Sequence, residues 1–239
     1  MTAAQPALTD AHELSAWIAR VYAHPELRRM GHNQRLEDLN LGLGWLYYGF
    51  ARLVRPARAV VIGSWRGFVP LVIAKACQDN VERGEVTFID PSLADDFWKD
   101  PAATRAHFRN FGLDNVRHHL LTTQDFVQTP DYAALDDIGL IFIDGYHTAA
   151  QARFDYEAFA GKLGPRAIVL FHDSMILKPS GIYGPDRRYD VDVKHYMDEL
   201  RQDPGLQLLD LPFGTGLTVL RKTGGEHDVV LSTEPRRPR

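Results

Sequence analysis

Two apolar segments of the chain each run into a pair of side chains that could carry acid–base or metal chemistry. The first, I-F-I-D-G-Y-H-T, contains Asp144 and His147, and the second, A-I-V-L-F-H-D-S, contains His172 and Asp173. Carboxylates rarely stand at the end of a buried strand without a partner. If both segments are parallel strands of one sheet, their carboxyl ends lie at the same edge, where ligands bind. We therefore expect these four side chains in one cleft.

These residue types suit two kinds of chemistry. Asp144 and Asp173 are hard oxygen ligands of the kind that Mg²⁺ prefers, and His172 is a weaker candidate ligand that also fits a structural role. His147 stands three residues after Asp144. It is a candidate general base, a role typically worth about 10²–10⁴-fold in rate, with Asp144 as its catalytic partner. A carboxylate beside an imidazole works as an acid–base pair without a metal, and either aspartate could instead cap a following turn, so these alternatives stay open.

The segments around these residues alternate between strand and helix patterns from Ala59 onward. Such alternation predicts a parallel sheet with helices on both faces. Two final strands a short loop apart are typical of an antiparallel hairpin added to that sheet. The expected strands are 59–63, 86–90, 116–121, 138–144, 167–173, 206–211 and 216–221, and the expected helices are 68–78, 102–111, 149–163 and 191–201, with a weak helical turn at 129–135.

The part of the chain before this pattern is expected to be helical. Thr9 and Asp10 can cap a helix that ends near Tyr22, and leucines at helical spacing predict a second helix over 34–53, although its glycines weaken it. We expect residues 1–56 to form a helical extension that caps the pocket or makes a dimer contact. Residues 57–222 form the main domain, and residues 223–239 a mobile tail.

Bulk composition excludes several classes of function. The net charge of −4 over 239 residues leaves no excess of basic side chains for a nucleic-acid partner. No run approaches the roughly 20 apolar residues of a membrane span. Cys77 is the single cysteine, so no disulfide forms within the chain. A cytoplasmic protein with a small-molecule substrate is the expectation, and a homo-oligomer stays open.

The first strand leads into a turn suited to a nucleotide. In V-V-I-G-S-W-R-G-F, Gly63 permits a tight turn and Gly67 a close backbone approach. Trp65 stands where a dinucleotide fingerprint needs its second glycine, which argues against a diphosphate cofactor. Asp90 ends the second strand, and its carboxylate can accept both ribose hydroxyl protons of an adenosine. Ser64, Trp65 and Arg66 of the turn are further candidates for contact with the nucleotide.

Together these motifs resemble the class I S-adenosylmethionine-dependent methyltransferases. More narrowly, the block from F-I-D-G-Y-H-T to L-F-H-D-S resembles the small-molecule O-methyltransferase-like group with an I-D-G-x-H and H-D signature. The resemblance covers about residues 36–220. Several positions depart from the pattern. These departures weaken the assignment of individual cofactor contacts more than the assignment of the fold. They are Val61 for an acidic residue, Trp65 for a glycine, Ala150 for a tyrosine and Pro165-Arg166 for Pro-Gly-Gly.

The resemblance implies a fold and a cofactor. The fold would be α/β, a Rossmann-like, mostly parallel sheet of seven strands that ends in an antiparallel hairpin. Gly63, Ser64 and Gly67 would lie against the methionine part of S-adenosylmethionine, and Asp90 would hold its ribose. Thr123, Gln124 and Asp125 follow the third strand, where such enzymes contact the adenine. In metal-dependent relatives, carboxylates at the matching strand ends hold the metal, which supports Asp144 and Asp173 as ligands.

The sequence therefore predicts an enzyme that transfers a methyl group to a hydroxyl of a small molecule, with magnesium assistance. Three alternatives compete with this prediction. One is a nicotinamide-linked oxidoreductase on a similar sheet, and another is a non-catalytic methyltransferase-like binding protein. The third uses the same carboxylates and histidines for hydrolysis or hydroxylation, since a fold does not determine function.

Overall fold

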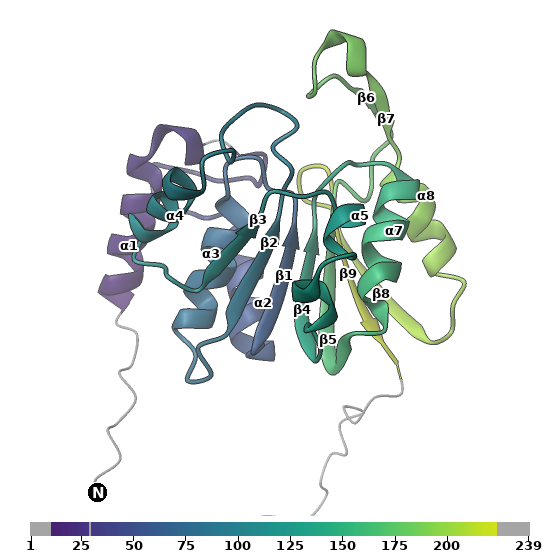
Figure 1. The fold of residues 1–239 in the computed structure, drawn as a ribbon, viewed down its shortest axis with the longest axis horizontal. Coiled ribbons are helices and arrows are strands. Elements are labelled where there is room, and N and C mark those ends of the chain that lie inside the picture. The colour runs from purple at the N-terminus through teal and green to yellow at the C-terminus, as the bar shows by residue number, and fades with distance from the viewer. Residues whose placement is uncertain (1–10, 29, 224–239) are drawn as a thin grey trace, which may run out of the picture.

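A seven-stranded sheet forms the centre of the molecule in a computed structural model that describes residues 11–28 and 30–223 (Figure 1). The strand order is β3-β2-β1-β4-β5-β9-β8. β1 to β5 are parallel neighbours, whereas β9 pairs antiparallel with both β5 and β8. The strands are β1 (Arg58–Ile62), β2 (Glu85–Ile89), β3 (Val116–His119), β4 (Ile138–Ile143), β5 (Leu163–His172), β8 (Leu206–Leu211) and β9 (Leu217–Lys222). The predicted mostly parallel sheet with a terminal hairpin is confirmed.

Helices cover both faces of this sheet because its central strands are apolar on both sides. Val60 and Ile62 of β1 pack with one group of helices, and Ala59 and Val61 pack with the other. This two-residue alternation is the side-chain period of a strand. The helices are α1 (Ala11–Ala23), α2 (Gly44–Val54), α3 (Phe68–Gln78) and α4 (Pro101–Arg109) on the second face, and α5 (Thr123–Phe126), α6 (Pro130–Ala133), α7 (Ala149–Ala160) and α8 (Val193–Leu200) on the first.

The chain between α1 and α2 departs from the prediction of a helix over 34–53. After a short 3-10 turn (Pro25–Leu27), residues 30–43 contain only turns, bends and one isolated bridge between Arg35 and Asn40, and α2 begins only at Gly44. Asn33, Leu39 and Gly42 all have positive φ, which an α-helix cannot contain. A Cβ at Gly42 would lie 2.1 Å from the carbonyl oxygen of His32, so the loop folds tightly back on itself. Leu36 and Leu39 pack against the core from a loop, at a spacing that also fits one face of a helix.

A short hairpin arm was not predicted at all. β6 (Lys178–Ser180) and β7 (Tyr189–Val191) pair with each other, and a 3-10 turn (Pro185–Arg187) joins them. The arm stands above the edge of the main sheet, beyond the carboxyl ends of β4 and β5 (Figure 1). Its glycines and prolines indicated only a loop. Its two strands have three residues each, which is too short for an alternation of apolar and polar residues to be recognised.

The described part of the proposed N-terminal extension belongs to the main core. Trp17, Val21 and Leu27 are buried in the same cluster as β1, β4 and α3. The boundary near residue 56 stays a prediction. The tail proposed at 223–239 lies, from residue 224 onward, outside the described residues, as do Thr9 and Asp10. None of the described helices is long and apolar enough to cross a membrane.

Candidate active site

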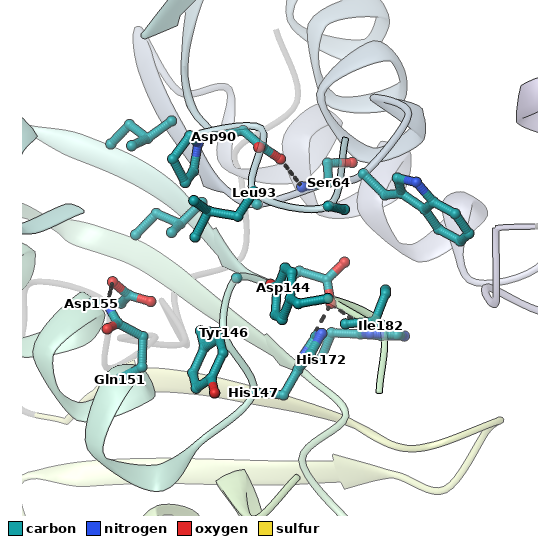
Figure 2. Close-up of a pocket in the computed structure, with 18 of the residues that line it drawn as sticks. Ser64, Asp90, Leu93, Asp144, Tyr146, His147, Gln151, Asp155, His172 and Ile182 are labelled. Atoms are coloured by element: carbon teal, nitrogen blue, oxygen red, sulfur yellow. Dashed lines mark hydrogen bonds and ion pairs between the residues drawn. The ribbon is translucent and has the colours of Figure 1, made fainter. Parts of the chain in front are cut away.

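One cavity of about 490 Å³ lies at the edge of the sheet where β1, β2, β3, β4 and β5 end. This volume is in the range of small-molecule sites. Its wall contains residues from the turns after all five strands, from the arm and from the segment before α2. Figure 2 shows the two ends of the cavity, with Asp155 and Gln151 at one side and His172 and Ile182 at the other. The two halves expected from the sequence therefore meet in one space.

An aspartate and a histidine form a buried pair at one end of the cavity. His172 Nδ1 donates a hydrogen bond of 2.8 Å to Asp144 Oδ1, and the two side chains are only 8% and 12% exposed. Burial opposes the charge on Asp144, but the attraction of His172 and its hydrogen bond outweigh it, so the pKa of the carboxyl is lowered. Burial likewise opposes the charge on His172, and the attraction of Asp144 leaves its pKa raised. Each of the two groups therefore favours the charged form of the other.

His147 lies beside this pair and faces a second carboxylate. Its Nδ1 is 3.6 Å from Asp173 Oδ2 and 3.9 Å from Asp144 Oδ1. Both distances exceed a hydrogen bond, so the imidazole is held near the carboxylates without being fixed by either. Asp173 has a φ of 53°, at the point where the chain leaves β5. All four residues that the sequence singled out line the cavity, whereas their roles stay predictions.

Sequence reasoning missed His32, which comes from the irregular segment before α2. Its ring lies 4.7 Å from the ring of His172, stacks on Phe68 and has its Nδ1 3.1 Å from the Tyr47 hydroxyl. Burial, followed by the repulsion of His172, lowers the pKa of His32 to about 3, so this imidazole is neutral. A lone histidine in the link between the two expected helices carried no signal for this position.

The turn after β1 approaches the turn after β4 so closely that only glycine fits. A Cβ at Gly63 would lie 2.4 Å from the carbonyl oxygen of Asp144, and its φ is +70°. Asp90 then accepts two backbone hydrogen bonds, 3.2 Å from the Ser64 N–H and 2.8 Å from the Ser92 N–H. Burial raises the pKa of Asp90 despite these donors. The carboxylate is thus fixed at the cavity wall between two turns.

Gly63→Ala is expected to destabilise the protein by about 1–3 kcal/mol more than Gly112→Ala. Both glycines have positive φ, so both substitutions carry the same backbone strain. A Cβ at Gly112 meets open space, whereas one at Gly63 meets backbone. Urea unfolding of the two variants separates the strain from the steric clash. Equal losses would show that the turns after β1 and β4 do not touch as described.

The other end of the cavity is built by α5 and α7. Gln124 Nε2 donates to Gln151 Oε1 at 2.8 Å, and Gln151 Nε2 donates to Asp155 Oδ1 at 2.8 Å. Asp155 is 1% exposed, and its Oδ2 has no hydrogen-bond partner among the described residues. Thr123 is buried beside them at the cavity wall. This end therefore presents a buried acceptor that lacks a donor.

Asp155→Asn is expected to remove a pH dependence of stability. Burial raises the pKa of Asp155 from 3.8 to about 6 in the folded protein. A group with a raised folded pKa contributes stability below its unfolded pKa and loses it as pH rises through the folded pKa. Between about pH 4 and pH 7, the wild type should therefore lose on the order of 3 kcal/mol relative to the variant. Urea unfolding across that range measures the difference, and parallel curves would contradict it.

Three candidates for the nucleotide are engaged elsewhere. Arg66 is not at the cavity, because its guanidinium is paired with Glu26 at 2.7 Å and Asp95 at 2.6 Å. Asp125 is not at the cavity either, and its Oδ2 accepts from the Thr122 hydroxyl at 2.7 Å. Gly67 makes room for the Trp98 ring rather than for the cavity. Ser64, Trp65, Thr123 and Gln124 do line it.

The predicted magnesium site is not formed by the side chains in this arrangement. Among the described residues, no group of three or more histidine, cysteine, aspartate or glutamate side chains is placed to hold a metal ion. Asp144 Oδ1 accepts from His172, which balances its charge without a cation. The donor set therefore does not fit Mg²⁺ as it stands, and magnesium stays a prediction from the sequence.

The central part of the chain is similar to known methyltransferase domains. Residues 60–174 match the model of a methyltransferase domain family. One curated relative, the uncharacterised protein y4gI of Sinorhizobium fredii, is 27% identical over 55% of this chain. The aligned region spans only 15% of the length of that relative. The activity of the whole relative therefore says nothing about this chain.

Solved structures share the fold over nearly the whole chain. The methyltransferase PaMTH1 of Podospora anserina, bound to S-adenosylhomocysteine, is 19% identical, with 87% and 86% of the two chains covered and a TM-score of 0.58. The O-methyltransferase TomG of Streptomyces achromogenes, in complex with S-adenosylmethionine, is 18% identical, with 91% and 93% covered and a TM-score of 0.59. An O-methyltransferase of Bacillus cereus is 15% identical, with 90% and 92% covered and a TM-score of 0.59. The protein has the Rossmann-like fold of these methyltransferases.

Proposed function

We propose that the protein transfers the methyl group of S-adenosylmethionine to a hydroxyl of a small molecule. The observation that carries this proposal is the single cavity that joins Gly63 and Asp90 to Asp144, His147 and Asp173. One half suits an adenosine and the other suits the removal of a proton. The matched methyltransferase domain supports the same activity.

The described residues fit S-adenosylmethionine at three points. Asp90 is fixed at the wall where it can accept from ribose hydroxyls. Asp155 Oδ2 is a buried acceptor without a donor, and the adenine amine is a donor of the required kind. Five aspartates line the cavity against a single lysine, which favours the positive sulfonium. They are Asp90, Asp95, Asp144, Asp155 and Asp173.

The chemistry divides between the bound cofactor and the residues of this chain. When bound, S-adenosylmethionine would supply an electrophilic methyl carbon for the acceptor oxygen, with its sulfur as the leaving group. His147 takes the hydroxyl proton on Nε2, since its Nδ1 faces Asp173. Asp173 then stabilises the imidazolium, and His172 Nδ1 lies 3.7 Å from the other oxygen of the same carboxylate.

Transfer of a labelled methyl group tests this function. The protein is incubated with methyl-labelled S-adenosylmethionine and a panel of small hydroxylated compounds, and the label is followed into product. Transfer that His147→Gln abolishes supports the proposal. Unchanged biological activity in Asp144→Ala and His147→Ala would instead favour a non-catalytic binding protein.

Magnesium is tested in the same assay. The sequence predicts that EDTA removes activity and that added Mg²⁺ restores it, because two carboxylates end neighbouring strands. Full activity after chelation would refute a required metal. The proton transfer to His147 does not require a metal ion.

A further inference from the structure

His32 is a buried histidine at the reactive end of the cavity that the proposed proton transfer does not use. It is 3% exposed and lines the cavity, and its ring lies 4.7 Å from the ring of His172, the partner of Asp144. Figure 2 shows Asp144, His147 and His172 gathered at this end, away from Asp155. His32 and His147 therefore both border the Asp144–His172 pair.

The backbone and the ring of His32 are both held by the folded chain. Its carbonyl oxygen accepts a hydrogen bond of 2.8 Å from the Leu43 N–H. Gly42 packs so closely against the same carbonyl that a Cβ there would lie 2.1 Å from the oxygen. The imidazole stacks on Phe68 with ring centroids 5.3 Å apart and an interplanar angle of 18°. The side chain is thus preorganised in the way that a group with a precise role in catalysis requires.

The Tyr47 hydroxyl determines which ring nitrogen of His32 carries the proton. Tyr47 is fully buried, and within the described part of the chain its hydroxyl has a single hydrogen-bond partner, His32 Nδ1 at 3.1 Å. A buried hydroxyl proton needs an acceptor, so Nδ1 must accept from the Tyr47 O–H. The rings of Phe68 and Phe142 beside the imidazole disfavour a second proton and a charge. The one remaining proton of the ring is therefore on Nε2.

The Nε2–H of His32 is a donor that the protein leaves free at the cavity. It has no hydrogen-bond partner among the described residues, and unlike Nε2 of His172 it is not enclosed by the protein. The five aspartates that line the same cavity offer acceptors instead. A neutral donor near a residue that removes a proton suits an oxygen on which negative charge develops.

We propose that His32 donates a hydrogen bond from Nε2 to the oxygen that accepts the methyl group, and that Tyr47 positions this donor by holding the proton on Nε2. The inference rests on the proposed methyl transfer and adds a catalytic and a positioning residue to it. As His147 takes the hydroxyl proton, the His32 N–H stabilises the charge that develops on the oxygen. His32 itself neither gains nor loses a proton in this step.

Three variants separate these roles in a methyl-transfer assay. His32→Phe keeps a flat ring against Phe68 but removes the donor, and it should lower kcat about ten- to hundredfold, the loss expected for a hydrogen bond to a charged group. His32→Gln should recover most of this loss, since the glutamine amide supplies an N–H with a similar reach. Tyr47→Phe should also lower kcat, although His32 is still present. The Kd of S-adenosylhomocysteine should stay unchanged in all three.

His24→Phe is the matched control for these variants. This partly buried histidine packs edge-on against two other rings and is away from the cavity. It should keep the wild-type kcat. A loss of kcat in His24→Phe equal to that in His32→Phe would overturn the inference, because replacing any packed histidine would then have the same effect.

Nitrogen-15 NMR of the histidine side chains shows the tautomer without any turnover. The signals of His32, assigned by their loss in His32→Gln, should show a protonated Nε2 and an unprotonated Nδ1 in the wild type. Tyr47→Phe should change this tautomer, because Nδ1 then loses its donor. A protonated Nδ1 in the wild type would overturn the inference, and so would a wild-type kcat in His32→Phe.

Titration with S-adenosylhomocysteine separates this inference from the proposed function. A loss in His32→Phe that is confined to the Kd of S-adenosylhomocysteine would overturn the inference, because His32 would then bind the cofactor and not the acceptor oxygen. Absent binding of S-adenosylhomocysteine to the wild type would refute the methyl transfer itself and the role of His32 with it.

Discussion

Replacing His147 with glutamine is expected to lower kcat by about 10²–10⁴-fold and to leave the affinity for S-adenosylhomocysteine unchanged. The imidazole lines the cavity, and its Nδ1 faces Asp173 at 3.6 Å, which leaves Nε2 for the acceptor hydroxyl. Glutamine keeps a polar side chain of similar reach but cannot take up a proton near neutral pH. The loss should therefore fall on the proton transfer and not on binding.

The measurement is a steady-state methyl-transfer assay combined with calorimetric titration of S-adenosylhomocysteine. His195→Gln is the matched control, since this histidine is exposed on α8 and away from the cavity. A His147→Gln variant with wild-type kcat would remove this residue from the chemistry. A loss confined to cofactor affinity would make it a binding residue instead.

The second large effect is expected on stability, when Asp144 is replaced by alanine. Breaking a buried ion pair by removing one partner typically costs about 3–5 kcal/mol, because the remaining charge stays buried without compensation. Here the remaining group is His172, 8% exposed, whose raised pKa depends on the carboxylate. The free energy of unfolding, measured in urea near pH 6, should fall by about this amount.

An exposed aspartate provides the control for this experiment. Asp136 pairs with Arg58 at 2.5 Å, but its side chain is 75% exposed. Asp136→Ala should therefore cost no more than about 1 kcal/mol. If Asp144→Ala cost equally little, then the pair with His172 would not be the buried ion pair that its geometry indicates.

The alternation of apolar runs and helices was sufficient to predict the sheet and its terminal hairpin. Buried parallel strands such as β4 have a continuous apolar pattern, and their β-branched residues and short length distinguish them from an apolar helix such as α3. The predicted helix over 34–53 was wrong in its first half, because the leucines of the loop have the same spacing as one face of a helix. The backbone at Gly42, which excludes the helix there, depends on contacts with His32 that are made only in the folded chain.

Site residues at the ends of strands were predictable from the sequence. Site residues whose position depends on tertiary packing were not. Asp144, His147, His172 and Asp173 reach one cavity because parallel strands deliver their ends to one edge. Arg66 was expected there from its place in the turn, but two carboxylates from distant segments hold it elsewhere. His32 enters from the irregular segment before α2, and Lys178 from a strand of three residues, so no period in the sequence marks either of them.

The most direct test of the proposed methyltransferase site is calorimetric titration of the wild-type protein with S-adenosylhomocysteine and, separately, with NAD⁺. We predict that S-adenosylhomocysteine binds with one site per chain and that Asp90→Ala weakens this binding by roughly tenfold or more, the loss expected for a hydrogen bond to a charged group. NAD⁺ should give no binding heat, because Trp65 stands at the cavity where a diphosphate would approach. Tight binding of NAD⁺ without binding of S-adenosylhomocysteine would contradict the account and favour an oxidoreductase.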